Sequence, residues 1–117
     1  MSTLLIPLGV ALFGGIASVL RFWLSSWSGW LPWGILFANT TASLLAGVVM
    51  IASDSPNALV IAGFCGGLST FSSFAAQTVE FFRQKQVLRG VINMAANLVL
   101  PFTAALAPVV LAAALLN

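Results

Sequence analysis

The sequence carries very little charge. Among its 117 residues are four Lys or Arg, two Asp or Glu and no histidine, while 61% are hydrophobic. This composition excludes an ordinary soluble domain. The two carboxylates, Asp54 and Glu80, lie outside the long apolar stretches, which removes most routes to general-base, metal-assisted or proton-relay chemistry. We therefore do not expect an enzyme. The single cysteine, Cys65, is interpreted as a small packing residue rather than a reactive thiol.

The few charged residues divide the chain into uncharged stretches. These stretches are 1–20, 22–53, 55–79 and 90–117. Each can hold one helix of about 20 residues, the length that crosses a hydrocarbon core roughly 30 Å thick. We predict an all-α polytopic membrane protein in which residues 1–117 form one four-helix subunit, with spans at about 4–24, 33–52, 58–82 and 90–116. No basic segment precedes the first apolar run, so we expect that span to be retained rather than cleaved.

The basic residues indicate an orientation in the plasma membrane. With four spans, the first and third loops share one side, and Arg83, Lys85 and Arg89 belong to the third loop. Arg21 lies near the same face, and the opposite side has only Asp54. Because cytoplasmic loops are enriched in Lys and Arg, we predict loops 1–2 and 3–4 in the cytoplasm and both termini outside. Membrane lipid surrounds such spans, and the clustered charge indicates no nucleic-acid partner.

Residues 63–74, GFCGGLSTFSSF, are unusual for the middle of a membrane span. They contain a Gly pair, four hydroxyl side chains, and Phe71 and Phe74 three residues apart. Glycine loosens a helix, and hydroxyls offer its backbone other hydrogen-bond partners. Irregular backbone at membrane depth occurs where protein or a water-filled cavity surrounds it. We predict a third helix that is broken near its centre.

Amides are the costly polar residues of the second and fourth spans. Asn39 needs partners inside the membrane, and both helix–helix hydrogen bonding and pore lining remain open for it. Asn93 and Asn97 are four residues apart and point to one face, with the same alternatives. Pro101 has no N–H to donate to the carbonyl of Asn97, which we expect to be freed.

Three blocks of sequence resemble one known family. Residues 63–74 are similar to the third-helix signature of the Fluc/CrcB fluoride channel family. GGIASVLR at 14–21 and PWGILFAN at 32–39 are similar to its first- and second-helix blocks, in the same order and spacing. The resemblance implies four-helix subunits that pair as an antiparallel dimer with two narrow fluoride pathways. It implies passive fluoride export and a structural Na⁺ at the dimer centre, held by the main-chain carbonyls of Gly66 and Ser69.

The resemblance also implies which side chains meet the ion. The implied fluoride pathway consists of Asn39, Phe71, Phe74, Ser72, Ser73, Asn93 and Asn97. Structural or interface roles are implied for Arg21, Thr70 and Gln77. Aromatic ring edges carry partial positive charge and amides can donate two hydrogen bonds, so a strongly hydrated anion could exchange water for several weak contacts.

Some positions depart from the family pattern. Gln77 stands where a glutamate is usual, Ala17 replaces a glycine, Ile35 replaces a threonine, and Ala42-Ser43 stands where two small residues are common. On the fourth span the family usually presents hydroxyls, whereas this chain has the aligned stripe Arg89, Asn93, Asn97 and Pro101. These departures concern the pore that this chain would contribute. The strong charge bias favours one fixed orientation and hence a heterodimer, with a homodimer as the alternative.

Two other functions fit a small four-helix membrane protein. A small-multidrug-type exporter couples to protons through a glutamate in its first span, and this first span has no carboxylate. A non-conducting membrane scaffold subunit would use all the polar residues as helix–helix contacts. Fluoride flux distinguishes these two from the channel.

Overall fold

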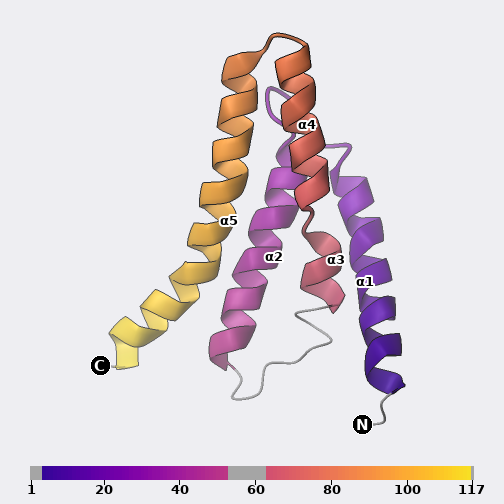
Figure 1. The fold of residues 1–117 in the computed structure, drawn as a ribbon. Coiled ribbons are helices and arrows are strands. Elements are labelled where there is room, and N and C mark those ends of the chain that lie inside the picture. The colour runs from indigo at the N-terminus through magenta and orange to yellow at the C-terminus, as the bar shows by residue number, and fades with distance from the viewer. Residues whose placement is uncertain (1–3, 53–62, 117) are drawn as a thin grey trace.

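The structure, a computed structural model, describes residues 4–52 and 63–116. All regular structure in these residues is helical (Figure 1). The helices are α1 (Leu5–Leu24), α2 (Trp33–Ala52), α3 (Gly66–Leu68), α4 (Phe71–Arg83) and α5 (Val87–Leu116). Within the described part, α1, α2 and α5 are long and apolar enough to cross a membrane. The predicted all-α fold is confirmed for these residues.

The predicted third span, 58–82, begins outside the described residues. Positions 63–65 form a π-helical turn that leads into α3, and α4 follows after Ser69 and Thr70. Helix α4 ends at Arg83 because Lys85 takes a left-handed conformation, with φ 60°. There the N–H of Lys85 donates to the carbonyl of Phe82 and that of Gln86 to Phe81, a Schellman-type end that satisfies the last carbonyls.

The helices form a splayed bundle in which α5 packs along α2 and α4, while α1 packs against α3. The turns 25–32 and 84–86 lie at one end of the molecule (Figure 1). The start of α1 and the end of α5 lie at the opposite end. Arg83 and Lys85 therefore share an end with the α1–α2 turn.

Small residues allow two of these helix contacts to be very close. A Cβ built on Gly67 would lie 2.4 Å from the carbonyl oxygen of Gly14, and one on Gly47 would lie 2.4 Å from that of Ala105. Neither position has room for a side chain. Such backbone contact is the usual way in which helices associate within a membrane.

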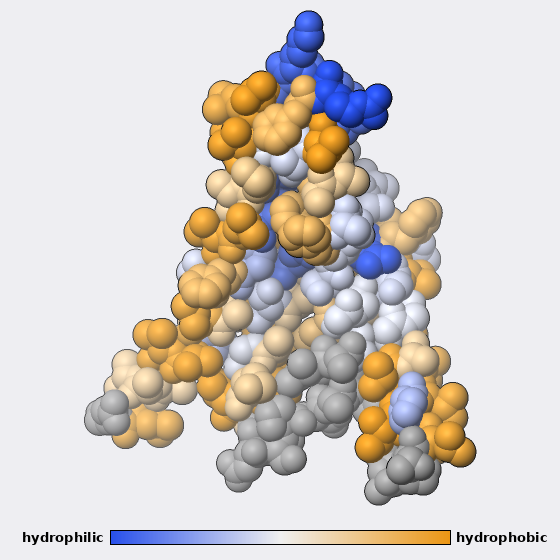
Figure 2. Space-filling model, in the orientation of Figure 1, coloured by the Kyte–Doolittle hydropathy of each residue, from blue (hydrophilic) through white to orange (hydrophobic). Residues whose placement is uncertain are grey.

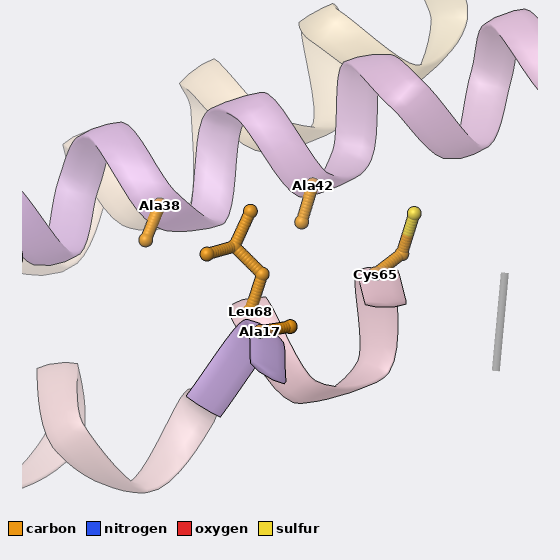
Figure 3. Close-up of a cluster of buried hydrophobic side chains, with 5 residues drawn as sticks. All are labelled: Ala17, Ala38, Ala42, Cys65 and Leu68. Carbon is orange, nitrogen blue, oxygen red and sulfur yellow. The ribbon is translucent and has the colours of Figure 1, made fainter. Parts of the chain in front are cut away.

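A small hydrophobic cluster lies where α1, α2 and the 63–68 segment meet. It consists of Ala17, Ala38, Ala42, Cys65 and Leu68. Leu68 points toward α2, between Ala38 and Ala42 (Figure 3). Cys65 is buried in the same cluster, where it packs as a small residue. This cluster fixes α3 against α2 immediately before the chain becomes irregular.

The surface is apolar over most of the helices. Figure 2 shows hydrophilic residues at the end where α4 turns into α5, hydrophobic residues over much of the remaining surface, and a second polar area about midway along the molecule. This second area appears at about the level of the passage from α3 to α4.

Candidate functional site

The chain is extended for two residues between α3 and α4. Ser69 has φ −77° and ψ 151°, and Thr70 has φ −152° and ψ 115°. Helix α4 then starts at Phe71 with Thr70 as its N-cap, whose Oγ1 accepts a hydrogen bond from the N–H of Ser73 at 3.1 Å. The Thr70 hydroxyl also lies 3.1 Å from Ser73 Oγ and 3.4 Å from Ser72 Oγ.

This geometry removes the helical partners of two carbonyls. In a continuous α-helix, the N–H of Thr70 would donate to Gly66 and the N–H of Ser73 to Ser69. Here the Thr70 N–H donates to Asn39 Oδ1 at 2.6 Å, and the Ser73 N–H donates to Thr70 Oγ1. The carbonyls of Gly66 and Ser69 are therefore released from the helical pattern. They are the two groups for which the family resemblance implies a role in holding Na⁺.

Gly66 and Ser69 border a shallow hollow of about 220 Å³. The other residues of its wall are Ala42, Ser43, Ala46 and Cys65. Released main-chain carbonyls suit a hard monovalent cation, because unwound helical segments supply such oxygens in membrane transporters. The donor set that these residues present therefore fits Na⁺.

Asn39 joins α2 to the irregular segment. Its Oδ1 accepts from the Thr70 N–H, while its Nδ2 donates to the Thr70 carbonyl at 3.3 Å and to Asn97 Oδ1 at 2.9 Å. Both amide hydrogens are thereby engaged. In this arrangement Asn39 makes the helix–helix contacts that the sequence left as one of its two alternatives.

The hydrogen bonds continue from Asn97 into α4. Asn97 Nδ2 donates to the main-chain carbonyl of Asn93 at 2.9 Å and to its Oδ1 at 3.1 Å. Asn93 Nδ2 donates to Thr78 Oγ1 at 2.9 Å, and the Thr78 hydroxyl donates to the carbonyl of Phe74 at 2.7 Å. We call Asn39, Asn97, Asn93 and Thr78 the amide chain. All four side chains are buried, and they connect α2, α5 and α4.

A second hollow, of about 240 Å³, adjoins one end of the amide chain. Its walls are formed by Asn39, Ser43, Ser69, Thr70, Phe71, Phe74, Asn97, Leu98 and Pro101. The rings of Phe71 and Phe74 lie 4.9 Å apart at 83°, an edge-to-face arrangement. Phe74 is buried, whereas Phe71 is 73% exposed and stands free on the surface of the single chain.

The structure brings some of the predicted pathway residues together and leaves others apart. Asn39, Asn97 and the phenylalanine pair share the second hollow. Asn93, Ser72 and Ser73 are not part of its wall; Asn93 is fully buried and Ser72 is exposed. Ser43 belongs to the wall and was not among the predicted sites, although its place four residues after Asn39 puts both on one face of α2.

Two residues assigned structural or interface roles lie elsewhere. Gln77 borders a separate hollow of about 250 Å³ together with Pro32 and Arg89, and its buried Oε1 has no partner among the described residues. Arg21 is half-buried near the end of α1, and its side chain forms no hydrogen bond within the described part of the chain. Neither side chain borders the two hollows beside the break.

Arg89 connects the two turns. Its Nε donates to the Trp30 carbonyl at 2.6 Å and its Nη2 to the Gly29 carbonyl at 3.1 Å, while its Cζ lies 4.6 Å from the centre of the Phe81 ring. It is absent from the wall of the second hollow, unlike Asn97 and Pro101 on the same predicted stripe. Charge-assisted and cation–π contacts of this kind hold the α1–α2 turn against the start of α5.

The sequence also matches a known family. A profile described as CrcB-like protein, Camphor Resistance (CrcB), matches residues 8–109, which is most of the chain. The chain belongs to the CrcB family. The resemblance expected from the three sequence blocks is thus confirmed, and with its apolar helices the CrcB-family chain is a multi-pass membrane protein.

Several CrcB-family relatives carry the name "Fluoride-specific ion channel FluC". One, from Methylocella silvestris, is 34% identical over 113 aligned residues, covering 85% of this chain and 83% of the relative. Another, from Rhizobium etli, is 35% identical over 107 residues, covering 81% and 86%. A third, from Leptospira interrogans, is 40% identical over 86 residues, covering 63% and 68%.

Proposed function

We propose that this chain is a subunit of a fluoride-specific ion channel that exports fluoride passively and so lowers its cytoplasmic concentration. The observation that carries the proposal is the similarity to relatives named as fluoride-specific channels over most of the chain. The function is transport rather than catalysis.

The second hollow supplies suitable chemistry for a small anion. Ring edges of Phe71 and Phe74 present partial positive charge, and the Ser43 hydroxyl on the same wall can donate a hydrogen bond. Each contact is weak and carries no formal charge. A series of such contacts can replace the water around fluoride without forming a deep trap, which conduction requires. The family resemblance also implies Asn39, Ser72, Ser73, Asn93 and Asn97 for the pathway, and of these Asn39 and Asn97 border the hollow.

Residues 63–83 form, in this proposal, one membrane-spanning segment that is interrupted at Ser69 and Thr70. The carbonyls of Gly66 and Ser69 would hold a structural Na⁺ there, supported by the loss of their helical hydrogen-bond partners. A bound cation contributes positive charge and holds the two half-helices in a fixed relation.

The complete channel would be an antiparallel dimer. In the single chain Phe71 stands exposed beside the break, and a second subunit facing it would cover the ring. The charge bias favours loops 1–2 and 3–4 in the cytoplasm with both termini outside. A chain with one fixed orientation needs an oppositely oriented partner, so we favour a heterodimer over a homodimer. A stable, fluoride-conducting dimer of the chain expressed alone would overturn the heterodimer.

A scaffold role is the second candidate, and the amide chain favours it. Asn39 and Asn97 use their amide hydrogens on protein acceptors, so these hydrogens are not available to an ion in this arrangement. A non-conducting subunit would need nothing more from these residues.

Fluoride efflux from liposomes tests the channel against the scaffold. The chain is reconstituted alone and with a co-purified second subunit, and we expect electrical, pH-independent fluoride flux in one of these preparations. Phe71→Ile should lower the flux about tenfold, the equivalent of losing about 1.4 kcal/mol of ring contact, and Asn39→Asp should lower it as well.

The matched control is Phe102→Ile, which changes an exposed phenylalanine of α5 that borders neither hollow beside the break. Its flux should equal that of the unchanged chain. Absence of flux in every subunit combination would support the scaffold, and flux coupled to a pH gradient would support an exporter.

A further inference from the structure

We propose that Thr78 and Asn93 are positioning residues for the cation-holding break, although neither borders the hollow that contains Gly66 and Ser69. This inference rests on the proposed Na⁺ site. The amide chain transmits an orientation from α4 and α5 to Asn39, and Asn39 then withdraws the Thr70 N–H from the carbonyl of Gly66.

The first step is that backbone groups at both ends fix the direction of the amide chain. Which end of an asparagine amide is nitrogen follows from its partners. The Thr70 N–H can only donate, so Asn39 must present its oxygen there and its nitrogen toward Asn97. At the other end, the carbonyl of Phe74 can only accept, so the Thr78 hydroxyl donates to it and receives from Asn93 Nδ2.

The second step is that Asn93 keeps its orientation through Thr78, and that Asn93 in turn supports Asn97. The main-chain carbonyl of Asn93 accepts from Asn97 Nδ2, which independently turns Asn97 Oδ1 toward Asn39. Asn93 itself is fully buried, so water cannot replace a partner that it loses. Its amide stays in place because Thr78 accepts from Nδ2 while Oδ1 accepts from Asn97.

The third step connects the hydrogen bonds of the amide chain to the extended residues between α3 and α4. Removing the Thr78 hydroxyl leaves Asn93 Nδ2 with only a long contact of 3.5 Å to the carbonyl of Phe74. The hydrogen bonds of Asn93, Asn97 and Asn39 then weaken in turn, because each polarises the next. The Thr70 N–H is held less firmly by Asn39, and it competes for the carbonyl of Gly66 with the cation.

The test is the Na⁺ dependence of thermal unfolding of the purified chain in detergent, or of its complex if it requires a partner. NaCl is exchanged for choline chloride at constant ionic strength, and the midpoint Na⁺ concentration for stabilisation is measured for the unchanged chain, Thr78→Val and Thr78→Ser. If the free energy of that buried hydrogen bond is transmitted to the cation site, the midpoint for Thr78→Val rises about two- to tenfold. Thr78→Ser retains the hydroxyl and should restore the original midpoint.

Thr103→Val, at an exposed position of α5, is the matched control and should leave the midpoint unchanged. If Thr78→Val does not fold, Thr78→Cys takes its place, since a thiol is a weak hydrogen-bonding group of similar size. A lower melting temperature with an unchanged midpoint would overturn the positioning role, because it would show a purely structural contribution. An unchanged chain that is insensitive to Na⁺ would overturn the Na⁺ site and this inference together, while fluoride flux would still test the channel separately.

Discussion

At the scale of single residues, Asn39 determines how the irregular segment is held. It pairs with both the N–H and the carbonyl of Thr70, much as a neighbouring strand would, and also reaches Asn97. Few side chains can supply an acceptor and two donors from one short group. A buried amide is costly in a membrane, and here its cost is offset by complete pairing.

Replacing Asn39 by leucine should therefore destabilise the fold. The Thr70 N–H and Asn97 Oδ1 would lose their partner, at about 1–3 kcal/mol for each buried group left without a hydrogen bond. We expect a clearly lower melting temperature in detergent. Thr40→Val is the control on the adjacent residue: Thr40 Oγ1 is buried without a partner among the described residues, so its removal should leave the melting temperature unchanged or higher. Equal effects of the two substitutions would contradict this interpretation.

At the scale of helices, the contact between α1 and α3 depends on the absence of side chains. Gly67 and Gly14 bring the two backbones together immediately before the break. Because α3 is only three residues long, it has little stability of its own and is held by its neighbours α1 and α2. The position of the released carbonyls therefore depends on this packing.

Gly67→Ala should separate α1 from α3. Its Cβ would lie 2.4 Å from a backbone oxygen, which cannot move as a flexible side chain could. Overpacking of this kind costs about 1–3 kcal/mol, and the melting temperature in detergent should fall accordingly. Gly15→Ala is the control, since a Cβ there meets nothing within 4 Å. An unaltered melting temperature for Gly67→Ala would show that the two helices are not held this closely.

At the scale of the whole molecule, the two turns form one fixed end. Arg89 holds the α1–α2 turn to α5 through Gly29 and Trp30, whereas α1 and α5 diverge toward the opposite end (Figure 1). The basic residues gather at the fixed end, where Arg83 pairs with Glu80 on the surface. The charge bias that predicts orientation is therefore carried by the end at which Arg89 joins the α1–α2 turn to α5.

This arrangement predicts labelling from one side of the membrane. In a Cys65→Ala background, a cysteine placed at Lys85 should react with a membrane-impermeant maleimide only in inside-out vesicles. A cysteine placed at Leu4, at the start of α1, should react only in intact cells. Labelling of both cysteines from both sides would show dual orientation and would favour a homodimer over the heterodimer.

The helical architecture could be predicted from the sequence because it follows from the length and composition of the uncharged stretches. Uncharged stretches of membrane length have few alternatives to a helix, and Asn93 and Asn97 had to share a face at a spacing of four. The sequence could not predict that Asn97 would meet Asn39, or that Thr78 would complete the chain of contacts. Those pairings depend on how α2, α4 and α5 approach one another, and i,i+4 spacing says nothing about which neighbour a face meets.

The chemical identity of the amide chain has a consequence for proton leakage across the membrane. Hydrogen-bonded rows of Asp, Glu or His inside a membrane can pass protons from group to group. Carboxamide and hydroxyl groups have no proton that they release near neutral pH. The amide chain, which runs from the Thr70 backbone to the Phe74 carbonyl, therefore makes the interior of the protein polar without providing groups that transfer protons. An anion exported beside this row would carry charge across the membrane but no protons, so the pH difference across the membrane would not be spent through the protein.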